Sequence, residues 1–269
     1  MEKYIIYKGS GGITHMLRGI NYCIYRAKET KRTLIIDTLQ HNAFLMNFNN
    51  IFSINDEYLK YYDHYDNIRK DVKYFDMEID DIKKSPISCN KKKYYIRNYN
   101  ISNVNWNTPN DIIIYSGTDG NIKFKSIKVV KPILDSLNNE TKINDNYISG
   151  HFRNTDLKNN INNFIQRLQK KIDETNIKTF YLATDCFYAH EKIINEIPNI
   201  NIIQNTLPPP NISNLHYGST DKYKQVYECL RDIYFILKSD HFIPSINSGM
   251  SLLIIEMKKS KINFFDSKN

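Results

Sequence analysis

The chain has 269 residues and a formal net charge of +8 at pH 7. This length suffices for one large domain or for two compact domains, each with its own core. No run approaches the roughly twenty apolar residues of a membrane helix, and the first residues lead into an apolar strand rather than a signal peptide. The cysteines have no paired spacing typical of a metal site. We therefore expect a cytoplasmic protein with reduced thiols and no membrane span.

The positive charge favours an anionic partner. Residues 91–97 mix lysine, tyrosine and arginine, as do proteins that bind single-stranded nucleic acid. Acidic residues are plentiful just before this segment, and no known nucleic-acid motif occurs in the chain. A nucleotide sugar or an acidic glycan fits the charge equally well, so we expect no nucleic-acid partner.

The first elements in chain order are a strand over residues 4–7, a glycine-rich loop, a helix over 16–30 and a strand over 33–37. The glycine spacing in the loop fits neither the dinucleotide-binding nor the P-loop pattern. We expect Gly11 and Gly12 to form a tight turn that lets a substrate approach the backbone. The turn would carry His15 to the carboxyl end of the first strand.

The middle of the chain is less regular and rich in Asn and Tyr. Residues 111–115 resume as a buried strand, residues 124–137 are expected to be helical, and a polar stretch at 138–146 follows. This polar stretch is the predicted boundary between a domain of residues 1–140 and a domain of residues 141–269.

The second domain begins with an apolar strand that runs into His151, Arg153 and Asp156, ahead of an amphipathic helix. In an open α/β sheet, ligands bind at the carboxyl ends of the strands. The planar guanidinium of Arg153 suits a phosphate. A helix-capping Asp156 beside a structural Arg153 is the alternative interpretation.

Two further strand-to-helix units place polar residues at the same edge. A strand over residues 178–184 ends in Asp185, followed by a helix. A short strand near Asp240 leads into a turn of Asn247, Ser248 and Gly249 that opens another helix. The free N–H groups of such a helix start bind anions. Strand and helix alternate on both sides of the predicted boundary, which indicates an α/β fold of two Rossmann-like βαβ domains facing a cleft.

These segments resemble the fucosyltransferases that share an H-x-R-R-[TG]-D motif, which include the nodulation-factor, core and protein O-fucosyltransferases. Residues 151–156 match that motif, with Asn154 in place of the second Arg. Residues 183–185 match the second motif of these enzymes, and residues 239–248 match the third. Residues 11–15 resemble their opening G-G-[LI]-G-N-Q segment, with His15 in place of the Asn.

The resemblance implies a GT-B-like fold, with an acceptor-side N-terminal domain and a GDP-sugar-binding C-terminal domain. It implies an inverting, metal-independent transfer of fucose from GDP-fucose to a glycan, a protein or a small hydroxyl acceptor, with no cofactor. The D-x-D carboxylates that commonly hold a metal-bound diphosphate are absent, and Asp63, Asp66, Asp80 and Asp81 substitute for them poorly.

The implied catalytic residues are Arg153, which would take the charge that develops on the leaving β-phosphate, and His15, a candidate base. Asp185 would accept hydrogen bonds from guanine, and His151 would assist the base or the ribose. The expected donor-binding set is Gly11, Gly12, His151, Arg153, Asp156, Asp185, Asp240, Asn247, Ser248 and Gly249. Structural alternatives remain open: His15 as a helix cap, His151 as a core histidine and Asp240 as a capping or buried carboxylate.

Two other functions also remain open. One keeps the fold but uses another GDP-sugar or makes a galactoside fucosyltransferase-type linkage. The other is a non-catalytic basic protein that binds nucleic acid or a polyanionic glycan, an interpretation favoured by the missing second Arg.

Overall fold

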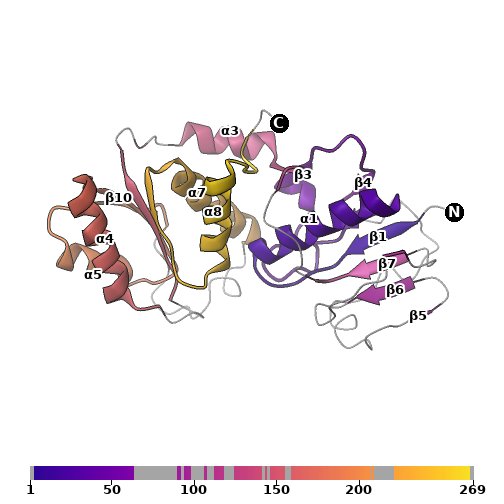
Figure 1. The fold of residues 1–269 in the computed structure, drawn as a ribbon, viewed down its shortest axis with the longest axis horizontal. Coiled ribbons are helices and arrows are strands. Elements are labelled where there is room, and N and C mark those ends of the chain that lie inside the picture. Colours follow the sequence, from indigo (N-terminus) through magenta and orange to yellow (C-terminus); the bar gives the residue numbers. More distant parts are fainter. Residues whose placement is uncertain are drawn as a thin grey trace. The chain divides into compact units, whose positions relative to one another are not determined.

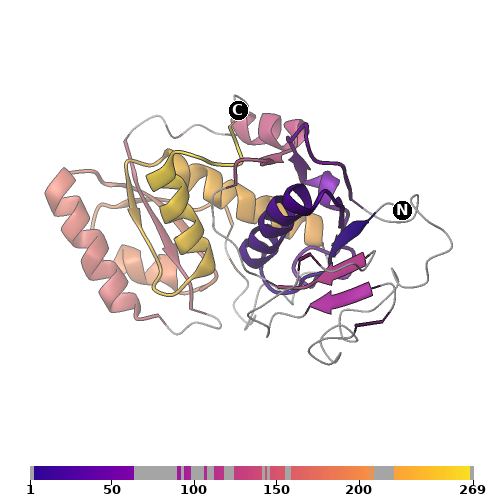
Figure 2. The same ribbon diagram turned by 45° about the vertical axis from the view of Figure 1, so that its right-hand side comes forward.

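The computed structural model describes residues 3–63, 90–91, 94–97, 106–107, 112–117, 124–140, 143, 146–154, 159–206, 208 and 221–266. The chain forms two compact units (Figures 1 and 2). Unit 1 comprises Met1–Lys131 and Ile262–Asn269, and unit 2 comprises Pro132–Lys261. No helix in the described part of the chain is both long enough and apolar enough to cross a membrane.

Unit 1 contains a six-stranded sheet in the order β4-β2-β1-β7-β6-β5. Its neighbouring strands are parallel, except that β5 and β6 are antiparallel. The strands are β1 (Tyr4–Tyr7), β2 (Thr33–Ile36), β4 (Tyr61–Tyr62), β5 (Asn90–Lys91), β6 (Tyr94–Arg97) and β7 (Ile112–Tyr115). Every residue of β1, β2 and β7 is buried, which explains their continuous apolar sequences.

Helix α1 (Ile13–Thr30) packs against β1 and β2 of unit 1 through an apolar stripe. It begins earlier than the sequence indicated, because Gly12 takes the N-cap position. It ends at Lys31, which adopts a left-handed conformation (φ 55°). Only a short loop therefore separates the carboxyl end of β1 from the start of the helix.

A second, two-stranded sheet in unit 1 pairs β3 (Phe52–Ile54), which follows the short helix η1 (Phe48–Asn50), with β8 (Ile127–Val129). Phe264 packs edge-on against Phe52, and its carbonyl oxygen accepts a hydrogen bond from the N–H of Val129. These contacts explain why the C-terminal segment belongs to unit 1.

The predicted domain boundary at residue 140 therefore needs two corrections. Helix α3 (Lys131–Asn139) belongs to unit 2, because Ser136 and Asn138 hydrogen-bond to Tyr227 and Tyr234 of a unit 2 helix. Residues 262–269 belong to unit 1 rather than to the second domain.

Unit 2 is built on a four-stranded parallel sheet in the order β11-β10-β9-β12. Figure 1 shows α4 and α5 on one face of this sheet and α7 and α8 on the other. The strands are β9 (Ile148–Phe152), β10 (Thr179–Thr184), β11 (Asn201–Ile203) and β12 (His241–Ile243). The helices are α4 (Ile161–Thr175), α5 (Ala189–Glu196), α7 (Lys222–Lys238) and α8 (Gly249–Ser260). This is a doubly wound Rossmann-like arrangement.

Alternation along β9 decides which side chains enter the core and which reach α8. Ile148 and Phe152 pack into the apolar cluster formed with α4 and α5. Gly150 faces the same way, and an added Cβ would lie 2.6 Å from Phe164. Ser149 and His151 consequently point to the opposite face, the one covered by α7 and α8.

Candidate functional site

The carboxyl ends of β9, β10 and β12 meet at one edge of the unit 2 sheet. Arg153 follows β9, Asp185 follows β10 and Ser245 follows β12. Strand β9 is the first of the unit 2 strands in sequence. The next strand, β10, pairs on one side of it and β12 pairs on the other, so the strand order reverses at β9. Such a switch point is where open α/β sheets bind ligands.

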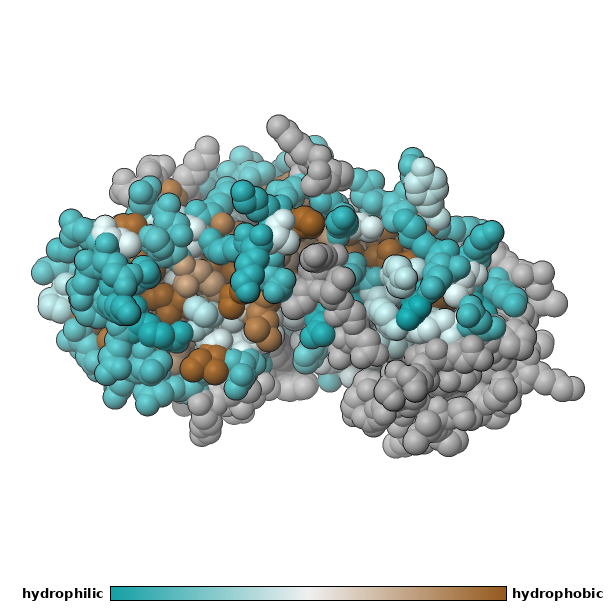
Figure 3. Space-filling model, in the orientation of Figure 1, coloured by the Kyte–Doolittle hydropathy of each residue, from teal (hydrophilic) through white to brown (hydrophobic). Residues whose placement is uncertain are grey.

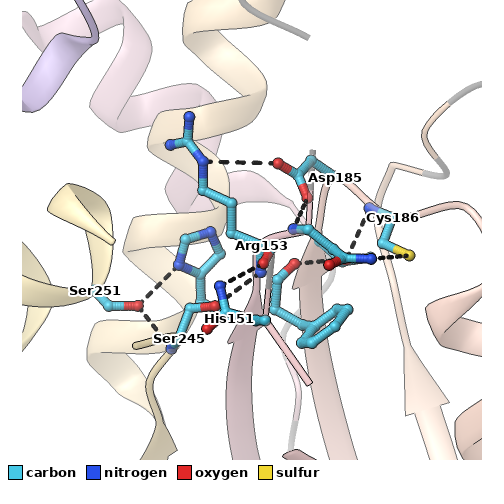
Figure 4. Close-up of polar contacts among 10 residues, drawn as sticks. His151, Arg153, Asp185, Cys186, Ser245 and Ser251 are labelled. Carbon is cyan, nitrogen blue, oxygen red and sulfur yellow. Dashed lines mark hydrogen bonds and ion pairs between the residues drawn. The ribbon is translucent and has the colours of Figure 1, made fainter. Parts of the chain in front are cut away.

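The backbone of Arg153 is held from two sides. Its N–H donates to Ser245 Oγ (2.9 Å), and its carbonyl oxygen accepts from Asn159 Nδ2 (2.7 Å). Its side chain retains 17% exposure, and Nε lies 3.8 Å from Asp185 Oδ2. Figure 4 shows the guanidinium extending beyond the strand end. The backbone of Arg153 is thus held at the sheet edge, and its side chain stays partly exposed there.

Asp185 joins the ends of β9 and β10. Its Oδ1 accepts from the backbone N–H of Asn154 (2.7 Å), while Oδ2 faces Arg153. The amide of Asn154 points to Cys186 Sγ (3.9 Å). Asp185 thus binds the backbone that follows β9 and faces the guanidinium of Arg153 at the same time.

His151 is almost fully buried on the α8 side of the sheet. Its Nδ1 lies 2.9 Å from Ser251 Oγ. Burial lowers the pKa of the imidazole to about 3, with a further contribution from the charge of Arg153. His151 is therefore a neutral ring at physiological pH. His151 is therefore a buried histidine, as the structural alternative expected, and it also lies close to Arg153.

The start of α8 supplies anion-binding groups. Leu252 makes the first bond within the helix, from its N–H to Ser248 O, so the preceding N–H groups lack intrahelical partners. The N-cap residue Ser248 is fully buried, and its Oγ has no hydrogen-bond partner among the described residues. Asn247, just before it, adopts a left-handed conformation (φ 59°) that Asn tolerates.

Apolar surface borders this polar edge. Ile246 and Leu252, on either side of the α8 N-cap, are 58% and 52% exposed. Figure 3 shows hydrophobic side chains reaching the surface of unit 2 between hydrophilic ones. A cavity of about 40 Å³ lies on the α4 side, lined by Phe152, Asn159, Asn160, Asn163, Phe164, Arg167, Ser245 and Ile246. The edge can thus contact both charged and apolar parts of a ligand.

Asp240 does not lie with these residues, contrary to the sequence prediction. Strand β12 begins only at His241, so Asp240 precedes the strand, at the amino end of the sheet. There its Oδ2 accepts from the N–H of Tyr147, and its own N–H donates to Tyr147 O. These bonds join the starts of β9 and β12, which makes Asp240 structural.

In unit 1, the predicted residues Gly11, Gly12 and His15 lie together at the carboxyl end of β1. Gly11 has a φ of 102°, and a Cβ there would lie 3.0 Å from His15 Nδ1. His15 is exposed and belongs to the first turn of α1. Since Gly12 is the N-cap, the alternative in which His15 caps this helix is wrong.

The same edge of unit 1 holds buried polar residues that the sequence did not single out. Lys8 and Asp37, which follow β1 and β2, form an ion pair of 2.9 Å with both side chains almost fully buried. His41 is fully buried, and neither ring nitrogen has a hydrogen-bond partner in the described part of the chain. Burial, with a smaller contribution from the charge of His15, lowers the pKa of His41 to about 4.

Asp156 lies outside the described residues, as do Asp66, Asp80 and Asp81. Among the residues that are described, no group of three or more His, Cys, Asp or Glu side chains is arranged to hold a metal ion. Ser245, Ser251 and Asn159 also belong to the site but were not predicted. Their only sequence signal is that small polar residues occur between a strand and a helix.

The fold of the two units indicates the structural class of this chain. Two Rossmann-like α/β units with mainly parallel sheets form a GT-B-like fold, as the sequence predicted. No protein-family model and no curated protein matches the sequence.

Several solved structures share this fold over nearly the whole chain. One is NodZ alpha-1,6-fucosyltransferase soaked with GDP-fucose, with a TM-score of 0.60, 14% identity, and coverage of 94% of this chain and 92% of that chain. Fucosyltransferase NodZ from Bradyrhizobium gives a TM-score of 0.58, 13% identity, and coverage of 95% and 93%. POFUT1 in complex with GDP gives a TM-score of 0.55, 11% identity, and coverage of 94% and 93%.

Proposed function

We propose that the protein is an inverting glycosyltransferase that moves fucose from GDP-fucose to a hydroxyl acceptor. The observation that carries the proposal is the convergence of Arg153, Asp185, His151 and the start of α8 at one switch-point edge. NodZ and POFUT1, which share the fold, have been solved with GDP-fucose or GDP. Accordingly, unit 2 would bind the GDP-sugar and unit 1 would bind the acceptor.

Arg153 carries the leaving-group step in this proposal. Cleavage of the glycosidic bond leaves negative charge on the β-phosphate, and the guanidinium stabilises that charge through charge-assisted hydrogen bonds. The N–H groups of Gly249 and its neighbours, together with the Ser248 hydroxyl, would bind the same diphosphate. An anion there would give the buried Ser248 Oγ the partner that the described residues do not provide.

Asp185 would read the base. Guanine presents N–H donors at N1 and N2 to a carboxylate, whereas the corresponding edge of adenine has an acceptor at N1. His151 would contact the base or the ribose. In unit 1, His15 would bind the acceptor or remove its proton, since imidazole is the side chain that most often serves as a general base.

A thermal-shift panel of GDP, ADP, UDP, GDP-fucose and GDP-mannose tests the proposal. A ligand at a hundred times its Kd adds about 2.7 kcal/mol of stability, so GDP and GDP-fucose should raise the Tm and ADP should not. Asp185→Asn should weaken the shift with GDP. Equal shifts with GDP and ADP would contradict base reading, and a larger shift with GDP-mannose would favour a different GDP-sugar.

Metal independence is part of the proposal. A guanidinium and helix N–H groups meet the phosphate charge, so transfer in excess EDTA should stay within about twofold, whereas a catalytic metal contributes several kcal/mol. Loss of transfer that manganese restores would point instead to the carboxylates between Asp63 and Asp81.

One observation favours the non-catalytic alternative. Asn154 replaces the second Arg of the motif and directs its side chain to Cys186, so the site has one guanidinium fewer. Oligonucleotides and a polyanionic glycan belong in the same panel for this reason. Stabilisation by these polyanions without stabilisation by GDP would favour the binding protein.

A further inference from the structure

Ser251 contacts His151 and belongs to a chain of hydrogen bonds that joins the end of β9, the turn after β12 and helix α8. The N–H of Arg153 donates to Ser245 Oγ (2.9 Å), and the N–H of Ser245 donates to Ser251 Oγ (3.0 Å). Ser251 Oγ in turn lies 2.9 Å from His151 Nδ1. Figure 4 shows the imidazole between Ser251 and the side chain of Arg153.

The direction of the last hydrogen bond follows from the groups that surround the serine. A hydroxyl has one hydrogen to donate, and the N–H of Ser245 can only donate to it. Within the described residues, His151 Nδ1 is therefore the one acceptor in hydrogen-bond contact with the Ser251 hydroxyl. Ser260 of the same helix differs, since its hydroxyl donates to the carbonyl oxygen of Glu256.

A proton on His151 Nδ1 would leave two donors facing a buried serine whose own hydrogen had no acceptor. Leaving a buried donor unpaired is unfavourable, so Nδ1 is the acceptor. A neutral imidazole carries its single proton on the other nitrogen, Nε2. The low pKa of His151 agrees with a neutral ring.

We propose that Ser251 is a positioning and specificity residue: it fixes His151 as the Nε2–H tautomer, so that the ring donates a hydrogen bond to the keto oxygen of a bound guanine. This inference rests on the proposed function, because it takes the donor to be a guanosine diphosphate sugar. Adenine presents an amino group where guanine presents the keto oxygen, and two donors would then oppose each other. Ser251 would thus add to base selectivity without touching the nucleotide.

The nitrogen-15 chemical shifts of the ring report the tautomer directly, and the His151→Asn variant assigns the signals. At pH 7.5 the wild-type protein should carry the proton on Nε2, with Nδ1 unprotonated and hydrogen-bonded. In Ser251→Ala the ring should populate both tautomers. A wild-type proton on Nδ1 would overturn the inference whichever nucleotide binds.

Nucleotide affinities test the consequence, with Ser260→Ala as the matched loss of a hydroxyl on the same helix. Inosine diphosphate (IDP) keeps the keto oxygen but lacks the amino group that Asp185 would read. Ser251→Ala should weaken GDP and IDP together by about threefold to tenfold, the value of one net hydrogen bond, with little change for ADP. Ser260→Ala should change none of them.

The outcomes separate this inference from the proposed function. Unchanged discrimination between GDP and ADP in Ser251→Ala would overturn the selectivity role, even if GDP binds the wild type tightly. Failure of both GDP and IDP to bind the wild type would overturn the proposed function and the reading of the keto oxygen. In that case the nitrogen-15 shifts would still show whether Ser251 fixes the Nε2–H tautomer of His151.

Discussion

The backbone N–H and the carbonyl oxygen of Arg153 are both held by hydrogen bonds before any ligand arrives. Ser245 accepts from its N–H, Asn159 donates to its carbonyl oxygen, and Asp185 lies beside its Nε. Because the backbone is held in this way, the Arg153 side chain starts from a fixed position, and a cation that needs little rearrangement stabilises charge on a leaving phosphate best. The Nε of the planar guanidinium faces Asp185, and a guanidinium, unlike the point charge of an ammonium, can bind a phosphate through two parallel hydrogen bonds.

Replacing Arg153 by Lys should therefore reduce turnover strongly even though the charge is kept. We expect a loss approaching the roughly 10²–10³-fold, about 3–4 kcal/mol, that the removal of one preorganised donor causes, and a larger loss in Arg153→Ala. The measurements are kcat for transfer from GDP-fucose and the Tm, which should change little. Near-normal turnover in Arg153→Lys would exclude the leaving-group role.

Arg26→Lys provides the matched control. Arg26 lies in the last turns of α1, at the opposite end of the helix from His15, and stacks on Tyr22 and Trp106. Its replacement should leave turnover within about twofold, because surface interactions of this kind contribute little beyond local stability.

The sequence predicted the residues of the site that follow strongly apolar strands. Arg153 and Asp185 come directly after β9 and β10, whose buried runs are easy to identify. Asp240 was misplaced because β12 has only three residues, and moving its start by one or two residues transfers a side chain to the other end of the strand. Ser245 and Ser251 were missed because their partners Arg153 and His151 lie more than ninety residues away in the chain.

At the scale of elements, long amphipathic helices and buried parallel strands were predicted well. Residues 124–137 were predicted as one helix, but Ile127–Val129 form β8 and the helix starts at Lys131. Strand β8 exists because it pairs with β3 and bonds to Phe264, contacts that no local pattern encodes. Tertiary pairing therefore overrode the helical spacing.

Helix α7 is joined to β10 by a polar contact inside an apolar interface. Tyr181 Oη donates to Asp232 Oδ1 (2.6 Å) and accepts from Asn205 Nδ2 (2.9 Å). Burial raises the pKa of the Asp232 carboxyl to about 7, although Tyr181 and Arg231 oppose that shift. The ionised form of Asp232 is therefore unfavourable in the folded state.

Asp232→Asn should stabilise the protein above pH 7. The amide oxygen still accepts from Tyr181, and the variant avoids a buried charge. In the wild type, the folded state keeps a proton that the unfolded state has lost, so stability falls as pH rises from about 4 through about 7. The gain at pH 8 should be on the order of 1 kcal/mol or more in urea unfolding, and it should shrink toward pH 4.

The exposed Asp173 of α4 supplies the control, since it bonds only to Gln169 among the described residues. Asp173→Asn should change the free energy of unfolding by less than about 0.5 kcal/mol at every pH. A destabilised Asp232→Asn at pH 8 would show that the charge itself holds α7 in place.

At the scale of the whole molecule, the described part of each unit includes a histidine that is buried in its neutral form, His41 in unit 1 and His151 in unit 2. His41 in unit 1 has a pKa of about 4, and His151 in unit 2 has a pKa of about 3. The unfolded chain binds protons at both positions below about pH 6.5. Acid therefore destabilises both units through histidine, while Asp232 opposes this trend in unit 2 over part of the same range.

Comparison of His41→Leu with the wild type isolates one of these contributions. The folded wild type binds a proton at His41 only below about pH 4, whereas the unfolded chain binds it below about 6.5. The wild type should consequently lose about 1.4 kcal/mol per pH unit relative to the variant between these values. Urea unfolding at intervals from pH 7.5 to 4.5 measures the difference, and a gap independent of pH would contradict the assignment.

The division into two units yields a final prediction about His15. The donor groups, from Arg153 to the start of α8, all belong to unit 2, whereas His15 belongs to unit 1. His15→Asn also restores the residue that the resembling fucosyltransferases carry at this position. If His15 is the base, the variant should lose transfer, and the acid limb of the rate profile should disappear. The Tm increase caused by GDP should be unchanged, because Arg153, Asp185 and the start of α8, which are proposed to bind the nucleotide, all belong to unit 2. Transfer equal to that of the parent would make His15 a positioning residue, and a lost response to GDP would show that unit 1 takes part in donor binding.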